Sequence, residues 1–400
     1  MSFTKVFKNY LSDLNKNVFL LAIVQVFTMT SLNLNMIISG LSGYIVAPYE
    51  WLSTFPLSLV FVFTMSGTIP ASLLMSRYGR RKIFLIGCTF SSIAGLVMGL
   101  ALISSNFLLF CAGSILLGIA NSISSFYRYA ATETVPDFVK PKAMSLVISA
   151  GLLAAFIAAE IAKFNDIYFE NLMYVASFFS MGILSLISIP FINNLKIPLP
   201  NLNKSRGRPI SEIIFKFGMI KAIISASAGY SIMTYLMTAT PLQIVNVCKF
   251  GLSTNAYIIQ WHVIAMFAPS FFTGTLIQKF KAEKVIFMGI ISYLIMIYFA
   301  LFAVTPLYYY LSLIFLGVGW NFLFLGGSSL IVSNVKPEEQ GKIQGIADFI
   351  IFSSVAFASL IAGFLHYNIG WENMVLGIIP IVIIIIFLNV PIWKKAERGI

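Results

Sequence analysis

The residues that could do chemistry in this chain are a few ionisable side chains placed inside or beside long apolar stretches. Arg128, Glu133 and Asp348 lie in or next to such stretches, and Glu160 is followed one helical turn later by Lys163. A charge at membrane depth is costly, so it faces a water-filled cavity or a partner of opposite charge. These residues are therefore candidates for substrate binding, for gating and for coupling to an ion gradient.

Each of these charges also has a plainer interpretation. Arg128 lies three residues from the end of its stretch, where its long side chain either snorkels to the headgroups or faces a cavity. Glu133 is either an interface residue or a coupling site, and Glu160 with Lys163 is either an ion pair at the rim or a coupling site. We predict that Arg128 binds substrate, and we keep Glu133 and Glu160 as coupling candidates.

A second set of candidates consists of amide, aromatic and imidazole side chains within the apolar stretches. Asn side chains there need hydrogen-bond partners, which a solute or another helix can supply. A His that titrates near neutral pH is either a proton-linked group or a satisfied packing residue. The predicted substrate-binding residues of this set are Asn33, Asn121, Tyr230, Tyr235, Gln260, His262, Trp320 and Asn321, and Asn35 is of the same kind.

Helices that cross a membrane must position these residues. Hydrophobic residues make up 59% of the 400 positions, charged residues 10%, and the mean hydropathy is +0.92, which excludes an ordinary soluble domain. A span needs about 20 predominantly apolar residues. Twelve stretches qualify: 18–45, 52–75, 83–103, 107–131, 143–162, 172–192, 219–245, 254–277, 285–304, 308–332, 343–365 and 374–393. Pro269 predicts a kink in the eighth stretch. The first stretch is too long to be the apolar core of a cleaved signal peptide.

Basic residues are distributed unevenly between the two sides of these spans. If both termini are cytoplasmic, all but three of the 26 Lys and Arg residues lie on the inner side, which is the bias typical of cytoplasmic loops. The net charge of +12 is therefore read as a topology signal and an attraction to anionic lipid, and no nucleic-acid partner is expected. We predict a multi-pass protein of the cytoplasmic (inner) membrane with both termini inside.

The sequence lacks the motifs of covalent and metal chemistry. It contains two His, three Cys without paired spacing, and no Gly-rich phosphate loop. We therefore expect no enzyme, no cofactor and no metal. The alternatives to a transporter are a membrane-embedded enzyme and a channel-like protein, although a channel's re-entrant loop or ring of like residues is not visible.

The two halves of the chain repeat one another at a spacing near two hundred residues. The segment 72–82 after the second span matches 274–284 after the eighth, at an offset of 202, and Gly118 matches Gly317 at an offset of 199. Both halves run in the same direction, so the repeat is parallel. We predict two six-helix bundles, residues 1–192 and 217–400, joined by a cytoplasmic linker at 193–216 that is rich in Lys, Arg and Pro.

The segment 72–82 resembles the loop signature of the major facilitator superfamily, Gly-x-Leu-x-Asp-Arg-x-Gly-Arg-Arg. The positions in register are Leu74, Arg77, Gly79, Arg80 and Arg81. Ser72 replaces the Gly of the signature and Ser76 replaces its Asp. The resemblance extends over essentially the whole chain through the twelve stretches and the repeat.

This resemblance implies an all-α membrane protein of twelve helices in two parallel six-helix repeats. It implies a monomeric secondary transporter that moves a small organic solute by alternating access, coupled to a proton gradient. In this family helices 1, 4, 7 and 10 line the cavity, and helix 11 lies beside helix 2 at the inner gate. We therefore predict a gate formed by Arg77, Arg81 and Asp348, in which Asp348 pairs with Arg77, although Arg128 has a similar depth. The sequence does not identify the substrate or the direction of transport.

Overall fold

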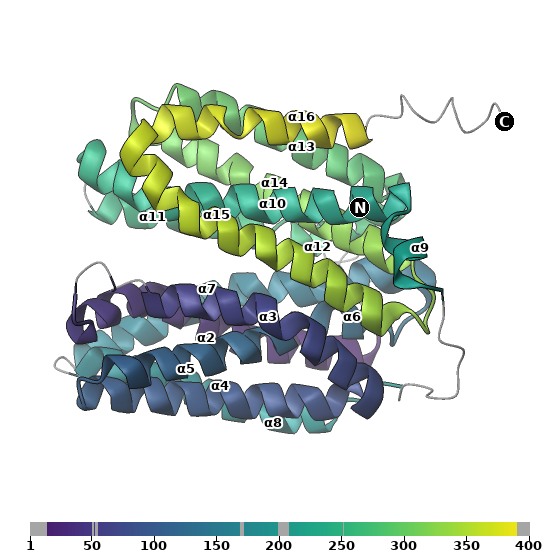
Figure 1. Cartoon of the computed structure of the whole chain (residues 1–400), viewed down its shortest axis with the longest axis horizontal. Helices are drawn as coiled ribbons and strands as arrows, with labels where there is room; N and C mark the ends of the chain where they lie inside the picture. The colour runs from purple at the N-terminus through teal and green to yellow at the C-terminus, as the bar shows by residue number, and fades with distance from the viewer. Residues whose placement is uncertain are drawn as a thin grey trace, which may run out of the picture. The chain divides into compact units, whose positions relative to one another are not determined.

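The computed structural model describes residues 14–49, 52, 55–168, 172–198, 208–250 and 252–389, and these residues form an almost entirely helical structure (Figure 1). The chain divides into two compact units. Unit 1 comprises Met1–Gly207 together with Pro337–Phe352, and unit 2 comprises Arg208–Lys336 together with Ser353–Ile400.

Unit 1 is a bundle of long apolar helices. Its helices are α2 (Lys16–Val46), α3 (Phe55–Tyr78), α4 (Arg80–Ile103), α5 (Phe107–Ser124), α6 (Tyr127–Thr132), α7 (Lys140–Tyr168), α8 (Met173–Asn193) and the first part of α15 (Gln340–Leu376), with a 3₁₀ turn, η2, at Asp137–Val139. The side chains of Asn15 and Asn106 cap α2 and α5 by accepting from backbone N–H groups at 3.2 and 3.0 Å. Helix α4 packs against α5 and α8, and α2 packs against α7 and α8. Fully buried Met98, Phe110 and Phe178 lie in the resulting core.

Unit 2 is organised around one central helix. Its elements are α9 (Ile210–Ile214), α10 (Phe217–Pro241), the π-helical turn η4 (Leu242–Val247), α11 (Leu252–Phe267), α12 (Ser270–Phe280), α13 (Ala282–Leu301), α14 (Pro306–Ser333), the second part of α15, and α16 (Ile379–Asn389). Helix α14 packs against α10, α11 and α13. It is therefore the element through which three neighbouring helices are held together.

Two of these helices are broken at residues that the backbone chemistry singles out. Pro269 has no N–H to donate into the helix, and α11 ends just before it and α12 begins just after it, which confirms the predicted kink. Gly370 has φ +74°, and a side chain would be strained in this conformation. Helix α15 is therefore two helices that meet at Gly370.

Eleven helices among the described residues are long and apolar enough to cross a membrane. Helix α10, which covers the seventh predicted span, is 25 residues long but is diluted by Ser, Thr and Gly. The repeat is visible in matched glycines. A Cβ added to Gly118 would lie 2.7 Å from the Val60 carbonyl oxygen, and one added to Gly317 would lie 2.7 Å from the His262 carbonyl oxygen. Both glycines thus allow the fourth helix of a repeat to approach its second.

Candidate functional site: a buried network of ion pairs

The most unusual feature of unit 1 is an ion pair buried among its helices. Arg128 Nη2 lies 2.5 Å from Asp348 Oδ1, and the two side chains are 6% and 0% exposed. The Tyr129 hydroxyl donates to the same carboxylate oxygen at 3.0 Å, and Arg128 Nη1 donates to the Ser125 carbonyl at 3.0 Å. The carboxylate is therefore held by two donors, and Arg128 does not reach out to the headgroups. A buried charge held in this way is costly to separate from its partner.

A break in the helix places Arg128 in this position. Helix α5 ends at Ser124 and the short helix α6 begins at Tyr127, so the chain turns at residues 125–126. After this turn Tyr127, Arg128 and Tyr129 are all buried. The Arg128 guanidinium lies 4.4 Å from the centre of the Tyr129 ring, which adds a cation–π contact.

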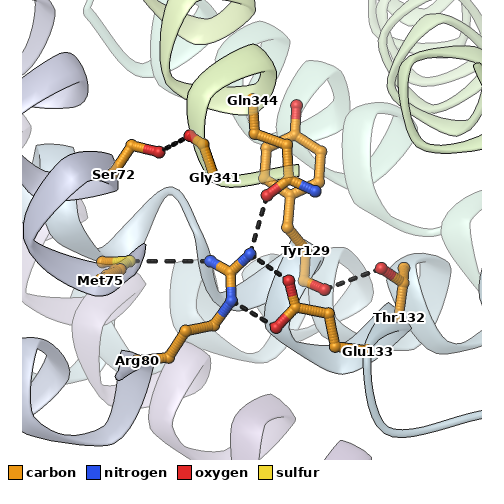
Figure 2. A network of polar contacts seen from close by, with 8 residues as sticks. All are labelled: Ser72, Met75, Arg80, Tyr129, Thr132, Glu133, Gly341 and Gln344. Atoms are coloured by element: carbon orange, nitrogen blue, oxygen red, sulfur yellow. Dashed lines mark hydrogen bonds and ion pairs between the residues drawn. The ribbon is translucent and has the colours of Figure 1, made fainter. Parts of the chain in front are cut away.

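A second ion pair, between buried Arg80 and partly exposed Glu133, lies in the same unit (Figure 2). Arg80 binds Glu133 with two nitrogens, through Nη2 and through Nε at 2.6 Å, and its Nη2 also donates to Gln344 Oε1 at 2.8 Å. Arg80 is only 8% exposed. A bidentate guanidinium–carboxylate pair fixes both orientation and distance, so Arg80 ties α4, Glu133 and α15 into one cluster. Glu133, a predicted coupling residue, is thus engaged in an ion pair.

The first part of α15 also packs closely against α3. The Ser72 hydroxyl donates to the Gly341 carbonyl, as Figure 2 shows, and a Cβ on Gly345 would lie 2.6 Å from Ser72 Cβ. A Cβ on Gly341 would lie 2.9 Å from Ser76 Cβ. The two serines that depart from the loop signature therefore lie where the backbones of α3 and α15 approach one another, and only small residues fit there.

The expected pairing of Asp348 with Arg77 is wrong in this structure, because Arg128 and Tyr129 hold the carboxylate instead. Gly79, with φ +86°, separates α3 from α4 and turns the chain so that Arg80 is buried. Arg77 and Arg81 are exposed, with Arg77 over the ring of Tyr78 and Arg81 3.4 Å from Asn193 Oδ1. The gating role predicted for these residues stays a prediction.

The other predicted residues of unit 1 lie apart from this network. Asn121 donates to the Thr64 hydroxyl at 3.0 Å, so a neighbouring helix satisfies part of its amide. Asn33 Nδ2 and Asn35 Oδ1 on α2 are buried, with no hydrogen-bond partner among the described residues. Glu160 is exposed on α7, and the side chain of Lys163, its predicted rim partner, lies outside the described residues.

Four aromatic side chains from three helices form a cluster in unit 2, which we call the aromatic cluster: Tyr230, Phe267, Trp320 and Phe324. Trp320 stacks on Phe324 at 5.3 Å between ring centres, and it meets Tyr230 and Phe267 edge to face at 5.6 Å each. Trp320 is 3% exposed, and its Nε1 has no hydrogen-bond partner among the described residues. The cluster thus combines flat apolar surface with one buried donor.

The remaining predicted residues of unit 2 have diverse surroundings. Asn321 is fully buried at the Pro269 break, where it donates to the Met266 carbonyl at 2.7 Å and accepts from the Thr273 hydroxyl at 2.7 Å, contacts that favour a structural role. His262 is fully buried and its Nδ1 donates to the Leu313 carbonyl at 2.8 Å. Tyr235 is half-buried, and Gln260 is exposed.

Arg80 and Gln344 are network members that the sequence reasoning did not place in a site. The sequence indicates only that Arg80 is one of several basic residues in the loop, because hydropathy does not distinguish a buried arginine from its exposed neighbours. Gln344 lies four residues before Asp348, so the two side chains share a helix face. This spacing is the feature of the sequence that could have predicted that Gln344 belongs to the network. Within the described part of the chain no three His, Cys, Asp or Glu side chains come together as metal ligands.

The sequence and the fold were compared with those of known proteins. The family model described as Major Facilitator Superfamily matches residues 11–268 and 250–398. The chain is 34% identical over 377 residues to the riboflavin transporter RfnT of Brucella anthropi, covering 93% of this chain and 94% of the relative. The fold matches the human organic anion transporter MFSD10 (TM-score 0.75, 12% identity, covering 93% of this chain and 98% of that one). It also matches an outward-facing bacterial ferroportin homologue (TM-score 0.74, 12% identity, covering 95% and 100%). The chain is a membrane transporter, not an enzyme, and belongs to the major facilitator superfamily.

Proposed function

We propose that this transporter carries riboflavin or a closely related flavin across the cytoplasmic membrane, with both termini on the cytoplasmic side. The observation that carries the proposal is the 34% identity to a riboflavin transporter over nearly the full length of both chains. The distribution of Lys and Arg described above supports the orientation.

The chemistry of the buried residues suits such a solute. Riboflavin is uncharged and consists of a flat ring system with a polar edge and a polyhydroxyl chain, so it needs aromatic surface and hydrogen-bond partners more than an opposite charge. The aromatic cluster offers the former, with Trp320 Nε1 as a donor. Asn33 and Asn35 offer buried amide atoms that still need a partner. The Arg128 guanidinium is neutralised by Asp348 and is not required as an anion site.

Transport by alternating access requires an element with two arrangements, and we assign this role to the Arg128–Asp348 pair. Arg128 lies on α6 and Asp348 on the first part of α15, both within unit 1, so the pair breaks in the proposed cycle when this part of α15 moves away from α6. In the proposed cycle the pair is closed while the inner side is shut. A proton gradient drives the cycle, with Glu133 and Glu160 as the coupling candidates.

The experiment is uptake of riboflavin by proteoliposomes that contain the purified protein. We expect saturable uptake that lumichrome, the ring system without the polyhydroxyl chain, inhibits. Trp320→Ala should weaken binding strongly, Trp320→Phe should weaken it less, and Trp261→Phe is the matched control because Trp261 is 51% exposed. Uptake that collapses on adding a protonophore supports coupling to protons. Folded protein that neither binds nor transports riboflavin would overturn the proposal.

A further inference from the structure

A groove runs between α7 and α8 in unit 1, away from the ion-pair network. Its volume is about 840 Å³, and both of its walls are mainly apolar, with Phe156 and Ile157 from α7 and Phe179 and Ile183 from α8. Among the described side chains that line the groove, one is charged, the exposed Glu160. The groove is therefore amphipathic, which is not expected of a surface that only faces hydrocarbon.

The position of the groove corresponds to one leaflet of a bilayer. The predicted fifth span ends at Ala162, just before Lys163, so we place the membrane boundary on α7 at Ala162. Glu160 lies two residues inside this boundary, about 3 Å at ~1.5 Å per residue, and Phe156 lies six residues inside it, about 9 Å. A leaflet's share of a ~30 Å hydrocarbon core is about 15 Å. The groove thus extends from headgroup level about 9 Å into this leaflet.

Polar groups gather at the headgroup end of the groove. Asn165, 3% exposed, lies just beyond the boundary and donates to the hydroxyls of Ser177 at 3.1 Å and Ser180 at 3.4 Å. Asn165, Ser180 and Glu160 all line the groove. The pattern of a carboxylate with neutral polar groups near the boundary, followed by apolar side chains toward the midplane, suits a phospholipid whose headgroup ends in a cationic amine.

We propose that this groove is a binding site for a phospholipid whose headgroup carries a protonated primary amine, as in phosphatidylethanolamine. The ammonium group donates to the Glu160 carboxylate, and an acyl chain lies between the apolar walls of α7 and α8. A primary ammonium offers three N–H donors to a carboxylate, whereas the choline headgroup offers none and an anionic headgroup is repelled. The inference is independent of which solute the transporter carries.

Native mass spectrometry of the purified protein with defined lipids tests this proposal. The wild type should retain phosphatidylethanolamine over phosphatidylcholine of the same acyl chains by about tenfold, as expected for one charge-assisted hydrogen bond. Glu160→Gln should remove this preference without changing the total amount of phosphatidylcholine bound. Glu212→Gln is the matched control, because Glu212 is an exposed acid outside the spans, on α9.

A second variant separates the acyl-chain contact from the headgroup contact. Ile183→Trp fills the groove, so it should lower retention of both lipids in equal proportion while it leaves Glu160 intact. Equal retention of both lipids by the wild type, or an unchanged preference in Glu160→Gln, would overturn the proposal. So would a mass of two protein chains that Ile183→Trp abolishes, because the occupant of the groove would then be a second copy of this chain.

Discussion

Replacing Asp348 by Asn tests whether the buried ion pair controls the balance between transporter states. Removing one partner of a buried pair destabilises the structure that contains it by about 3–5 kcal/mol. Asn keeps the size of Asp and still accepts a hydrogen bond from Tyr129 or Arg128, so we expect a smaller effect. We predict a shift of about 1–3 kcal/mol toward the state in which the pair is open, which is roughly 5- to 150-fold in population.

Cysteine accessibility measures this shift. In a background without Cys88, Cys111 and Cys248, a reporter cysteine replaces Thr132, which is 1% exposed and lies beside the network. Labelling from the inner side should accelerate at least fivefold in Asp348→Asn, and riboflavin uptake should slow more than binding weakens. Asp137→Asn is the control, because Asp137 is 94% exposed and its ion pair with Lys140 contributes little.

A double-mutant cycle decides whether the effect belongs to the pair. Arg128→Gln alone leaves a buried carboxylate without its charge partner, and the double variant leaves two neutral amides that can bond to one another. The double variant should therefore be less perturbed than the sum of the single variants. Additive effects, or an unchanged labelling rate in Asp348→Asn, would refute the reasoning and leave packing as the role of Asp348.

Three further predictions concern the surroundings of the pair and the structure of unit 2. Arg80→Lys loses the bidentate contact with Glu133 and should lower the free energy of unfolding by about 1–3 kcal/mol in a thermal or denaturant melt, and an unchanged melt contradicts this. Gly345→Val inserts a side chain against Ser72 and should accelerate labelling of the Thr132 reporter as Asp348→Asn does, whereas Gly377→Val, in a roomier position, should not. Asn321→Leu removes the amide that donates to the Met266 carbonyl and should destabilise the protein by about 1–3 kcal/mol, while an effect on solute affinity alone would contradict its structural role.

Hydropathy predicted the membrane spans well, because it depends on averages over about twenty residues. The kink at Pro269 was also predictable, since a proline acts on its own backbone wherever it lies. Helix α10 is an exception, because it is not among the eleven described helices that are long and apolar enough to cross a membrane. Its Ser, Thr and Gly residues lower its hydropathy, yet its length of apolar sequence still predicted it as the seventh span.

The partners within the site could be predicted only in part. That Arg128 and Asp348 need partners follows from their place in apolar sequence, but which partners they find depends on two local backbone details. These are the turn between α5 and α6, which buries Arg128, and the positive φ of Gly79, which buries Arg80 and leaves Arg77 and Arg81 exposed. Neither detail has a signature in hydropathy, and so the family position of Arg77 led to the wrong partner.

We expect Asp348 to matter more than the other buried charges because of how these charges are paired. Arg80 is paired with Glu133, and both lie in the first half of the sequence, so the proposed motion between the repeats would leave this pair intact. Gln344 and Asp348 reach the same network from the second half, but Gln344 is neutral, so its hydrogen bond to Arg80 is not an ionic link. Among the described ion pairs of unit 1, the Arg128–Asp348 pair is thus the one that joins the two halves of the sequence. We therefore expect the free energy of opening to depend on Asp348 more than on the other buried charges.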